Sequence, residues 1–189
     1  MITAHLDKPP VIGAIDIGLL QRMHHSLEFS QKNNRNPLAS ITREGIDYRR
    51  KTDIFVAFTK MIVELVASYE GVDTGASMLT IVPFRTIVPV GEVTVTVASA
   101  WHRDSRRYVV SNVLPTEFLV GAPQVPKKHS ADTSAYFNSS QFAQYEADYV
   151  YRPLVGDVVG LDMSHLHRSA INDTDHQIDR MFIQVLSQR

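Results

Sequence analysis

The sequence predicts a mainly β fold, a β-sandwich or open barrel that N-terminal helices buttress on one side. Two observations carry this prediction. Apolar residues recur at helical spacing in the first third of the chain, and after Gly75 they alternate with a period of two. Helices followed by a run of short strands are typical of domains in which a sheet structure packs against helices on one side.

Two helices are expected before residue 75. The first covers residues 16–31 and begins at Asp16; the second covers residues 52–69, begins at Thr52 and ends at Gly71. Their apolar faces carry Ile17, Leu20, Met23 and Leu27 in the first helix, and Ile54, Phe58, Met61, Ile62 and Leu65 in the second. Faces of this kind normally pack on another element, so we expect both helices to cover a sheet.

The rest of the chain is expected to form short strands. They cover residues 78–83, 92–101, 107–113, 117–120, 147–152, 157–161 and 181–186. Residues 121–140 are polar and predict a long loop, which would serve as a lid or binding loop or would simply be mobile. We expect one domain over residues 1–189, with residues 1–75 as a helical buttress and residues 76–189 as the β core.

The composition excludes several classes of protein. The chain has no cysteine, so a metal would have to bind His, Asp or Glu side chains. Its 19 basic and 20 acidic residues nearly cancel, which gives no indication of a nucleic-acid or membrane partner. There is no apolar run of membrane-spanning length, and we expect a cytoplasmic protein.

The strand at 92–101 leads to a candidate pair of metal ligands. If its alternation continues, His102 and Asp104 lie on the same face as Thr94, Thr96, Ala98 and Ala100, and Val93, Val95, Val97 and Trp101 lie on the other. The valine face is expected to pack on the helices. A His-x-Asp triplet alone is a weak signal, because such pairs also occur at surfaces and turns.

A second histidine region lies near the C-terminal end. His167 precedes Arg168 and Ser169, and His165 lies on the same face of the expected strand. Arg180 opens the last strand and shares a face with Phe182 and Gln184, opposite Met181, Ile183 and Val185. An arginine that opens an inward face near a metal can bind a carboxylate through two hydrogen bonds.

This order of motifs resembles the Fe(II)/2-oxoglutarate-dependent dioxygenases over residues 92–188. The resemblance implies a double-stranded β-helix, the jelly-roll fold that is also cupin-like. It implies that His102, Asp104 and His167 bind Fe(II) as the catalytic facial triad, with His165 competing for the distal position. It further implies that Arg180 binds the far carboxylate of 2-oxoglutarate. The expected activity is hydroxylation of a small molecule by molecular oxygen, with release of succinate and CO2.

Two further residues are candidates for cosubstrate binding. Tyr108 and Asn112 share a strand face with Val110 and either reach 2-oxoglutarate or are ordinary barrel residues. Nearby, Arg103, Arg106 and Arg107 form a basic cluster that either binds a carboxylate or phosphate or is simply solvated.

Two other functions remain open at this point. A cupin-type metalloenzyme that does not use 2-oxoglutarate would share the barrel and the metal, although the His-x-His pattern followed by Glu is absent around His102. A metal-free module would bind an acidic ligand through Arg180 and the basic cluster. The sequence indicates neither the identity of the small-molecule substrate nor the oligomeric state.

Overall fold

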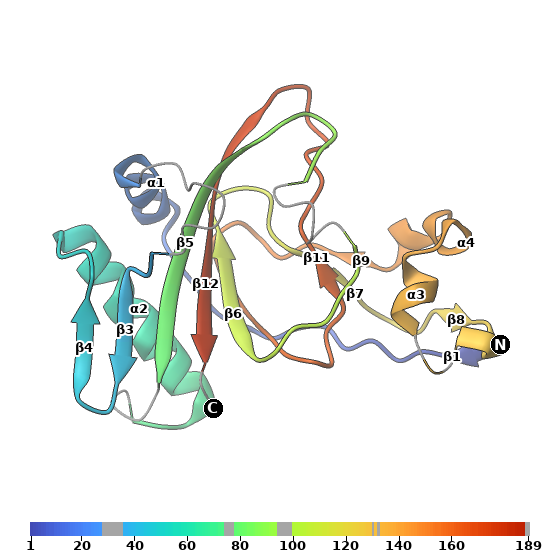
Figure 1. The fold of residues 1–189 in the computed structure, drawn as a ribbon, viewed down its shortest axis with the longest axis horizontal. Coiled ribbons are helices and arrows are strands. Elements are labelled where there is room, and N and C mark those ends of the chain that lie inside the picture. Colours follow the sequence, from blue (N-terminus) through green and yellow to red (C-terminus); the bar gives the residue numbers. More distant parts are fainter. Residues whose placement is uncertain (28–35, 74–77, 94–99, 130, 132, 188–189) are drawn as a thin grey trace.

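The computed structural model describes residues 1–27, 36–73, 78–93, 100–129, 131 and 133–187. Antiparallel sheets dominate it, and the two longer helices lie along one side of the largest sheet (Figure 1). The strands are β1 (Ile2–Thr3), β2 (Val11–Ala14), β3 (Ala39–Thr42), β4 (Gly45–Tyr48), β5 (Leu79–Val88), β6 (Arg107–Ser111), β7 (Glu117–Leu119), β8 (Gln124–Val125), β9 (Val150–Tyr151), β10 (Asp157–Leu161), β11 (His167–Arg168) and β12 (Ile178–Ser187). The helices are α1 (Ile17–Ser26), α2 (Asp53–Glu70), α3 (Thr133–Phe137) and α4 (Ser140–Ala143), with 3-10 turns η3 (Lys127–His129) and η4 (Glu146–Asp148).

The largest sheet has seven strands in the order β2-β10-β6-β12-β5-β3-β4. Its centre is the long pair β12–β5, which runs in register from Ile178 opposite Val88 to Ser187 opposite Leu79. A three-stranded sheet, β11-β7-β9, lies beside it, and β1 pairs with β8. The fold is therefore mostly antiparallel β with few helices, as in β-sandwich and cupin-like proteins.

The N-terminal third differs from the expected helical buttress because it also supplies three strands to the large sheet. β2 pairs with β10, and the hairpin β3–β4 continues the sheet beyond β5. Four-residue strands are too short for their alternation to stand out, and the strands that join β2 and β3 to the sheet, β10 and β5, lie far along the chain. Gly45, at a φ of 130°, marks the hairpin turn and is the one local signal that could have revealed it.

Both predicted helices are present. The side chain of Asp16 accepts a hydrogen bond from Leu19 N at 2.9 Å, and Gly71 ends α2 in the left-handed conformation at a φ of 64°, as expected. Thr52 occupies the N-cap of α2 but its side chain makes no capping bond, and α1 ends at Ser26, earlier than predicted. No helix in the described part of the chain is long and apolar enough to cross a membrane.

The two faces of the large sheet pack against different parts of the molecule. Its helix side carries Met181, Ile183 and Val185 of β12 in one buried cluster with residues of α1 and α2. On the other side Phe182 packs against a cluster that includes Phe118 of the small sheet. The alternation predicted for β12 is thus confirmed. Side chains of the large sheet, such as Phe182, and of the small sheet, such as Phe118, meet in the interior between the two sheets.

The helices α1 and α2 pack on β5, β6, β10 and β12. Val93 and Trp101, the described residues of the face that was expected to meet these helices, lie outside that cluster: Val93 pairs with Ile171, and Trp101 belongs to the cluster that includes α3 and α4. The other residues of the strand expected there, 94–99, lie outside the described residues.

The expected loop at 121–140 contains β8, η3 and α3 rather than irregular chain alone. Tyr136 and Phe137 of α3 and Phe142 of α4 form a separate apolar cluster with Trp101. The segment is therefore anchored next to the residues that precede His102.

Candidate metal centre

Backbone pairing brings the two predicted histidines face to face. His102 N donates to His167 O and His167 N donates to His102 O, both at 3.0 Å, so the residues form a directly opposed antiparallel pair. His167 also pairs with Phe118 of β7, which fixes it in the small sheet. The two imidazole centroids are consequently 4.3 Å apart.

Each imidazole is oriented by a carbonyl two residues earlier. His102 Nδ1 lies 2.8 Å from Ala100 O, and His167 Nδ1 lies 3.2 Å from His165 O. Because a carbonyl can only accept, Nδ1 carries a proton in both rings, and Nε2 is the nitrogen that is placed to bind a metal. The two Nε2 atoms lie 3.5 and 3.1 Å from the same oxygen, Asp104 Oδ2.

Three electron-pair donors aimed at one point require a cation between them, either a further proton or a metal ion. The donor atoms of His102, Asp104 and His167 all lie within 4.8 Å of one another. Two nitrogens, one carboxylate oxygen and orienting hydrogen bonds behind the imidazoles are the arrangement that Fe(II), Mn(II) or Zn(II) requires. The residues therefore fit a divalent metal.

Asp104 is held in its charged form. Contact with the His167 imidazole lowers the pKa of Asp104 most; partial burial acts in the opposite direction, and the charges of Arg107, His167 and His102 lower the pKa further. Arg107 Nη1 lies 3.2 Å from Asp104 Oδ2. A metal would thus meet Asp104 as an ionised carboxylate.

His165, the competitor for the distal position, points elsewhere. Its Nδ1 lies 3.0 Å from Asp162 Oδ1 and 3.2 Å from Ser164 Oγ, within the turn that precedes β11. It is not part of the group whose donor atoms converge on Asp104. Its backbone carbonyl nevertheless contributes, since it accepts from His167 Nδ1.

Arg180 is buried in the interior between the sheets. Its side chain is 3% exposed, and its Nε donates to Leu114 O at 2.9 Å. Burial lowers the pKa of Arg180 to about 9, so the guanidinium stays charged at neutral pH. The guanidinium lies 4.6 Å from the Phe182 ring, and Phe182 packs on the cluster that contains Phe118. The ring centroids of Phe118 and His167 are 6.0 Å apart. Arg180 therefore lies on the same side of the large sheet as Phe118, whose ring is close to that of His167.

The structure does not bring Tyr108 and Asn112 to this interior. Tyr108 lies on the helix side of β6, where its hydroxyl donates to Glu70 Oε1 at 2.6 Å. Asn112 Oδ1 accepts from Met181 N at 2.7 Å, which ties the end of β6 to β12. The shared face of Tyr108 and Val110 was predicted correctly, but that face meets the helices, and Asn112 lies just beyond the end of β6.

The fold has a counterpart among solved structures. The crystal structure of IDO from Bacillus thuringiensis superposes with a TM-score of 0.52 at 9% identity, over 91% of this chain and 86% of that one. Lower scores were found for the non-heme alpha ketoglutarate dependent epimerase SnoN from nogalamycin biosynthesis, at 0.46, 14% identity and 94% and 76% coverage, and for AviO1 from Streptomyces viridochromogenes Tue57, at 0.44, 12% identity and 98% and 89% coverage. No protein-family model and no curated protein sequence matches the chain. The superposition on IDO shows a likeness of fold.

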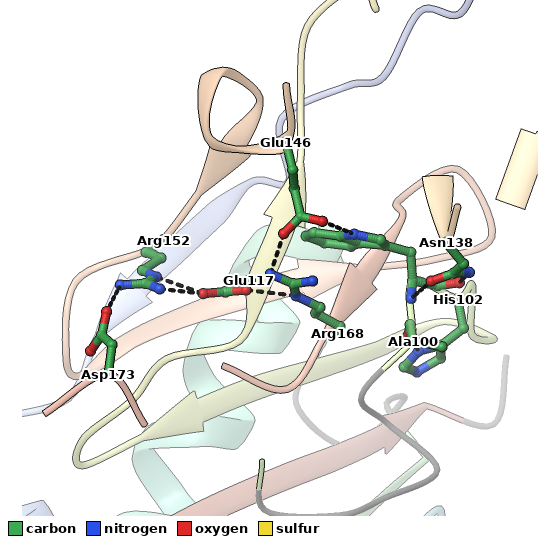
Figure 2. Close-up of polar contacts among 9 residues, drawn as sticks. Ala100, His102, Glu117, Asn138, Glu146, Arg152, Arg168 and Asp173 are labelled. Carbon is green, nitrogen blue, oxygen red and sulfur yellow. Dashed lines mark hydrogen bonds and ion pairs between the residues drawn. The ribbon is translucent and has the colours of Figure 1, made fainter. Parts of the chain in front are cut away.

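A polar network links the segment that contains Ala100 and His102 to Arg168, the residue after His167 (Figure 2). Asn138 clamps the residue before His102: Trp101 N donates to Asn138 Oδ1 at 2.7 Å, and Asn138 Nδ2 donates to Trp101 O at 2.9 Å. Glu146 accepts from Trp101 Nε1 at 3.2 Å and also from Arg168, the residue after His167. The guanidinium of Arg168 lies 4.3 Å from the Trp101 ring.

Glu117 completes this network. Its carboxylate is fully buried and accepts from Arg168 Nε and Arg152 Nε, each at 2.7 Å, and Arg152 continues to Asp173. Glu117 was not among the residues predicted from the sequence, although an acidic residue inside an otherwise apolar strand is a visible signal of a buried ion pair. Asn138 gave no signal, because its partner is a distant backbone.

Replacing Asn138 with alanine is expected to weaken metal binding about 10-fold, the range in which residues behind metal ligands act. The clamp fixes the Trp101 backbone and so the position of His102. Trp101 is the single tryptophan, so quenching of its fluorescence by Fe(II) under anaerobic conditions measures the dissociation constant. Gln144→Ala, which removes an exposed amide nearby, is the matched control and should bind like wild type. A lower melting temperature with unchanged metal affinity would assign Asn138 a purely structural role.

Proposed function

We propose that the chain is an Fe(II)- and 2-oxoglutarate-dependent oxygenase that hydroxylates a small molecule. The observation that carries this proposal is the convergence of His102, Asp104 and His167, with both Nε2 atoms presented by carbonyl-bound Nδ1 atoms. Two histidines and one carboxylate leave coordination positions for a cosubstrate and oxygen. The mainly β fold supports the proposal because it supplies the two facing sheets that such a centre needs.

In this proposal each residue has a defined task. His102, Asp104 and His167 hold the metal, and Arg180 binds the far carboxylate of 2-oxoglutarate through its planar guanidinium. Iron bound there supplies the redox chemistry by which one O2 and one 2-oxoglutarate convert a C–H bond to C–OH with release of succinate and CO2. The aromatic side chains of Phe118 and Phe182 line the interior and limit access of water.

Two alternatives make different use of the same residues. A cupin-type metalloenzyme would need the three ligands but would not need a buried Arg180. A metal-free binding module would need neither the lone pairs of the two imidazoles nor an ionised Asp104. The buried charge of Arg180 in the interior favours the oxygenase over the first, and the convergent donors favour it over the second.

The decisive experiment is an anaerobic spectral titration of the full chain with Fe(II) and then 2-oxoglutarate. We expect stoichiometric iron binding and, on addition of 2-oxoglutarate, a new visible charge-transfer absorption. A panel of amino acids and other small metabolites is then screened in air for succinate release above the substrate-free rate. Iron binding without a spectral response to 2-oxoglutarate would favour the cupin-type enzyme, and no iron binding would favour the module.

A further inference from the structure

A cavity of about 170 Å³ lies at the end of β6 and β10, beside the metal centre. Its wall includes Tyr69, Arg106, Arg107, Gly160, Asp162 and His165. Whole-ligand pockets usually measure roughly 300–1,000 Å³, so a cavity of this size accommodates one end of a ligand.

The cavity and the metal centre share two residues as a common wall. Arg107 lines the cavity and places its Nη1 3.2 Å from Asp104 Oδ2. His165 lines it too, and its carbonyl accepts from His167 Nδ1 at 3.2 Å. A group bound in the cavity would therefore contact residues that themselves contact two of the candidate metal ligands, Asp104 and His167.

The polar wall is arranged to bind an anion. Arg107 is held by Asp104, and Arg106 Nη2 lies 3.4 Å from Glu70 Oε1, whose side chain is 2% exposed. A guanidinium has five N–H donors in a rigid plane, so one edge held by a carboxylate leaves other donors for a ligand. Asp162, the acidic residue of the cavity wall, accepts from Ser164 N and Oγ at 2.8 and 2.6 Å, so its charge is directed into its own turn.

We propose that this cavity binds the oxyanion end, a carboxylate or a phosphate, of the molecule on which the metal centre acts, and that Arg106 and Arg107 are its ligands. The placement of a substrate at the metal rests on the proposed function, whereas the anion site itself does not. Two arginines oriented in advance by carboxylates bind an oxyanion without the cost of ordering their side chains. The rest of the substrate then extends past Arg107 toward the metal.

The test uses inorganic sulfate and acetate as probes of the metal-free full chain, followed by NMR of backbone and arginine Nε–H signals. Wild type should bind one of the two, with shifts at Arg106, Arg107 and Gly160. Arg106→Gln should weaken binding at least fivefold. Arg49→Gln removes the same charge from an exposed arginine of the β4 end and should bind like wild type. Arg106→Lys, which keeps the charge beside Glu70 but loses the planar fork, should fall between them.

Tighter binding of sulfate indicates that the substrate is a phosphate ester, and tighter binding of acetate indicates a carboxylic acid. Equal weakening by Arg49→Gln and Arg106→Gln, or no binding of either probe, would show that the cavity is not an anion site. If saturating 2-oxoglutarate displaces the probe from the Fe(II)-loaded protein, the cavity belongs to the cosubstrate and the proposal fails. Anion binding that depends on Arg106 in a protein that binds neither Fe(II) nor 2-oxoglutarate would retain the site and reject the proposed oxygenase.

Discussion

Replacing Asp104 or His167 with alanine should abolish both iron binding and turnover. Asp104 is the one anionic donor of the convergent group, and its oxygen lies within 3.5 Å of both imidazole Nε2 atoms. Removal of a ligand should cost more than the roughly 10- to 100-fold that loss of a residue behind the ligands costs. Iron content by elemental analysis and succinate formed per enzyme are the two measurements, with circular dichroism to establish that each variant is folded.

His165→Ala is the matched control for this prediction. It removes a buried imidazole two residues from His167 and should leave iron bound, because the His165 carbonyl that orients His167 remains. Loss of iron in His165→Ala with retention in His167→Ala would exchange the two assignments. Iron retained in both Asp104→Ala and His167→Ala would mean that the metal site is not formed by these residues, and the binding module would become the better function.

Replacing Arg180 with leucine should raise the Michaelis constant for 2-oxoglutarate by about one to two orders of magnitude. A charge-assisted hydrogen bond in a closed site contributes about 1.5–3 kcal/mol, which corresponds to that range. Iron binding should persist, because Arg180 is not one of the three residues whose donor atoms converge. Steady-state kinetics at saturating substrate and the iron content of the same preparation test both parts.

Arg180→Lys separates loss of charge from loss of packing. Lysine keeps a cation in the interior but lacks the planar fork, so the Michaelis constant for 2-oxoglutarate should rise by less than in Arg180→Leu. Melting temperatures of both variants report whether the hydrogen bond to Leu114 O contributes to stability. Unchanged dependence on 2-oxoglutarate in a folded Arg180→Leu protein would remove the cosubstrate assignment and favour the cupin-type enzyme.

The meeting of His102 and His167 shows which part of this candidate metal centre can be predicted from sequence. The His-x-Asp spacing places two donors on one side of the chain, and a third donor near the other end needs only one strand pairing to meet them. That pairing is present as the two reciprocal hydrogen bonds between His102 and His167. The network around Arg168 and Glu117 could not be derived in the same way, because its partners come from four separate segments of the chain.

By itself the sequence determined the alternation along β12, the helix ends at Asp16 and Gly71, and the residue types able to bind a metal without cysteine. These properties depend on local backbone geometry, and local geometry is encoded by neighbouring residues.

Only the tertiary structure showed that His167, and not His165, converges with His102 and Asp104, because the turn at Asp162 and the pairing of β11 with β7 set the direction of each side chain. It also decided that the face of Tyr108 meets the helices. The alternation of a strand fixes which residues share a face, but when both faces of a central strand are buried, only packing against distant elements decides which of them encloses the site.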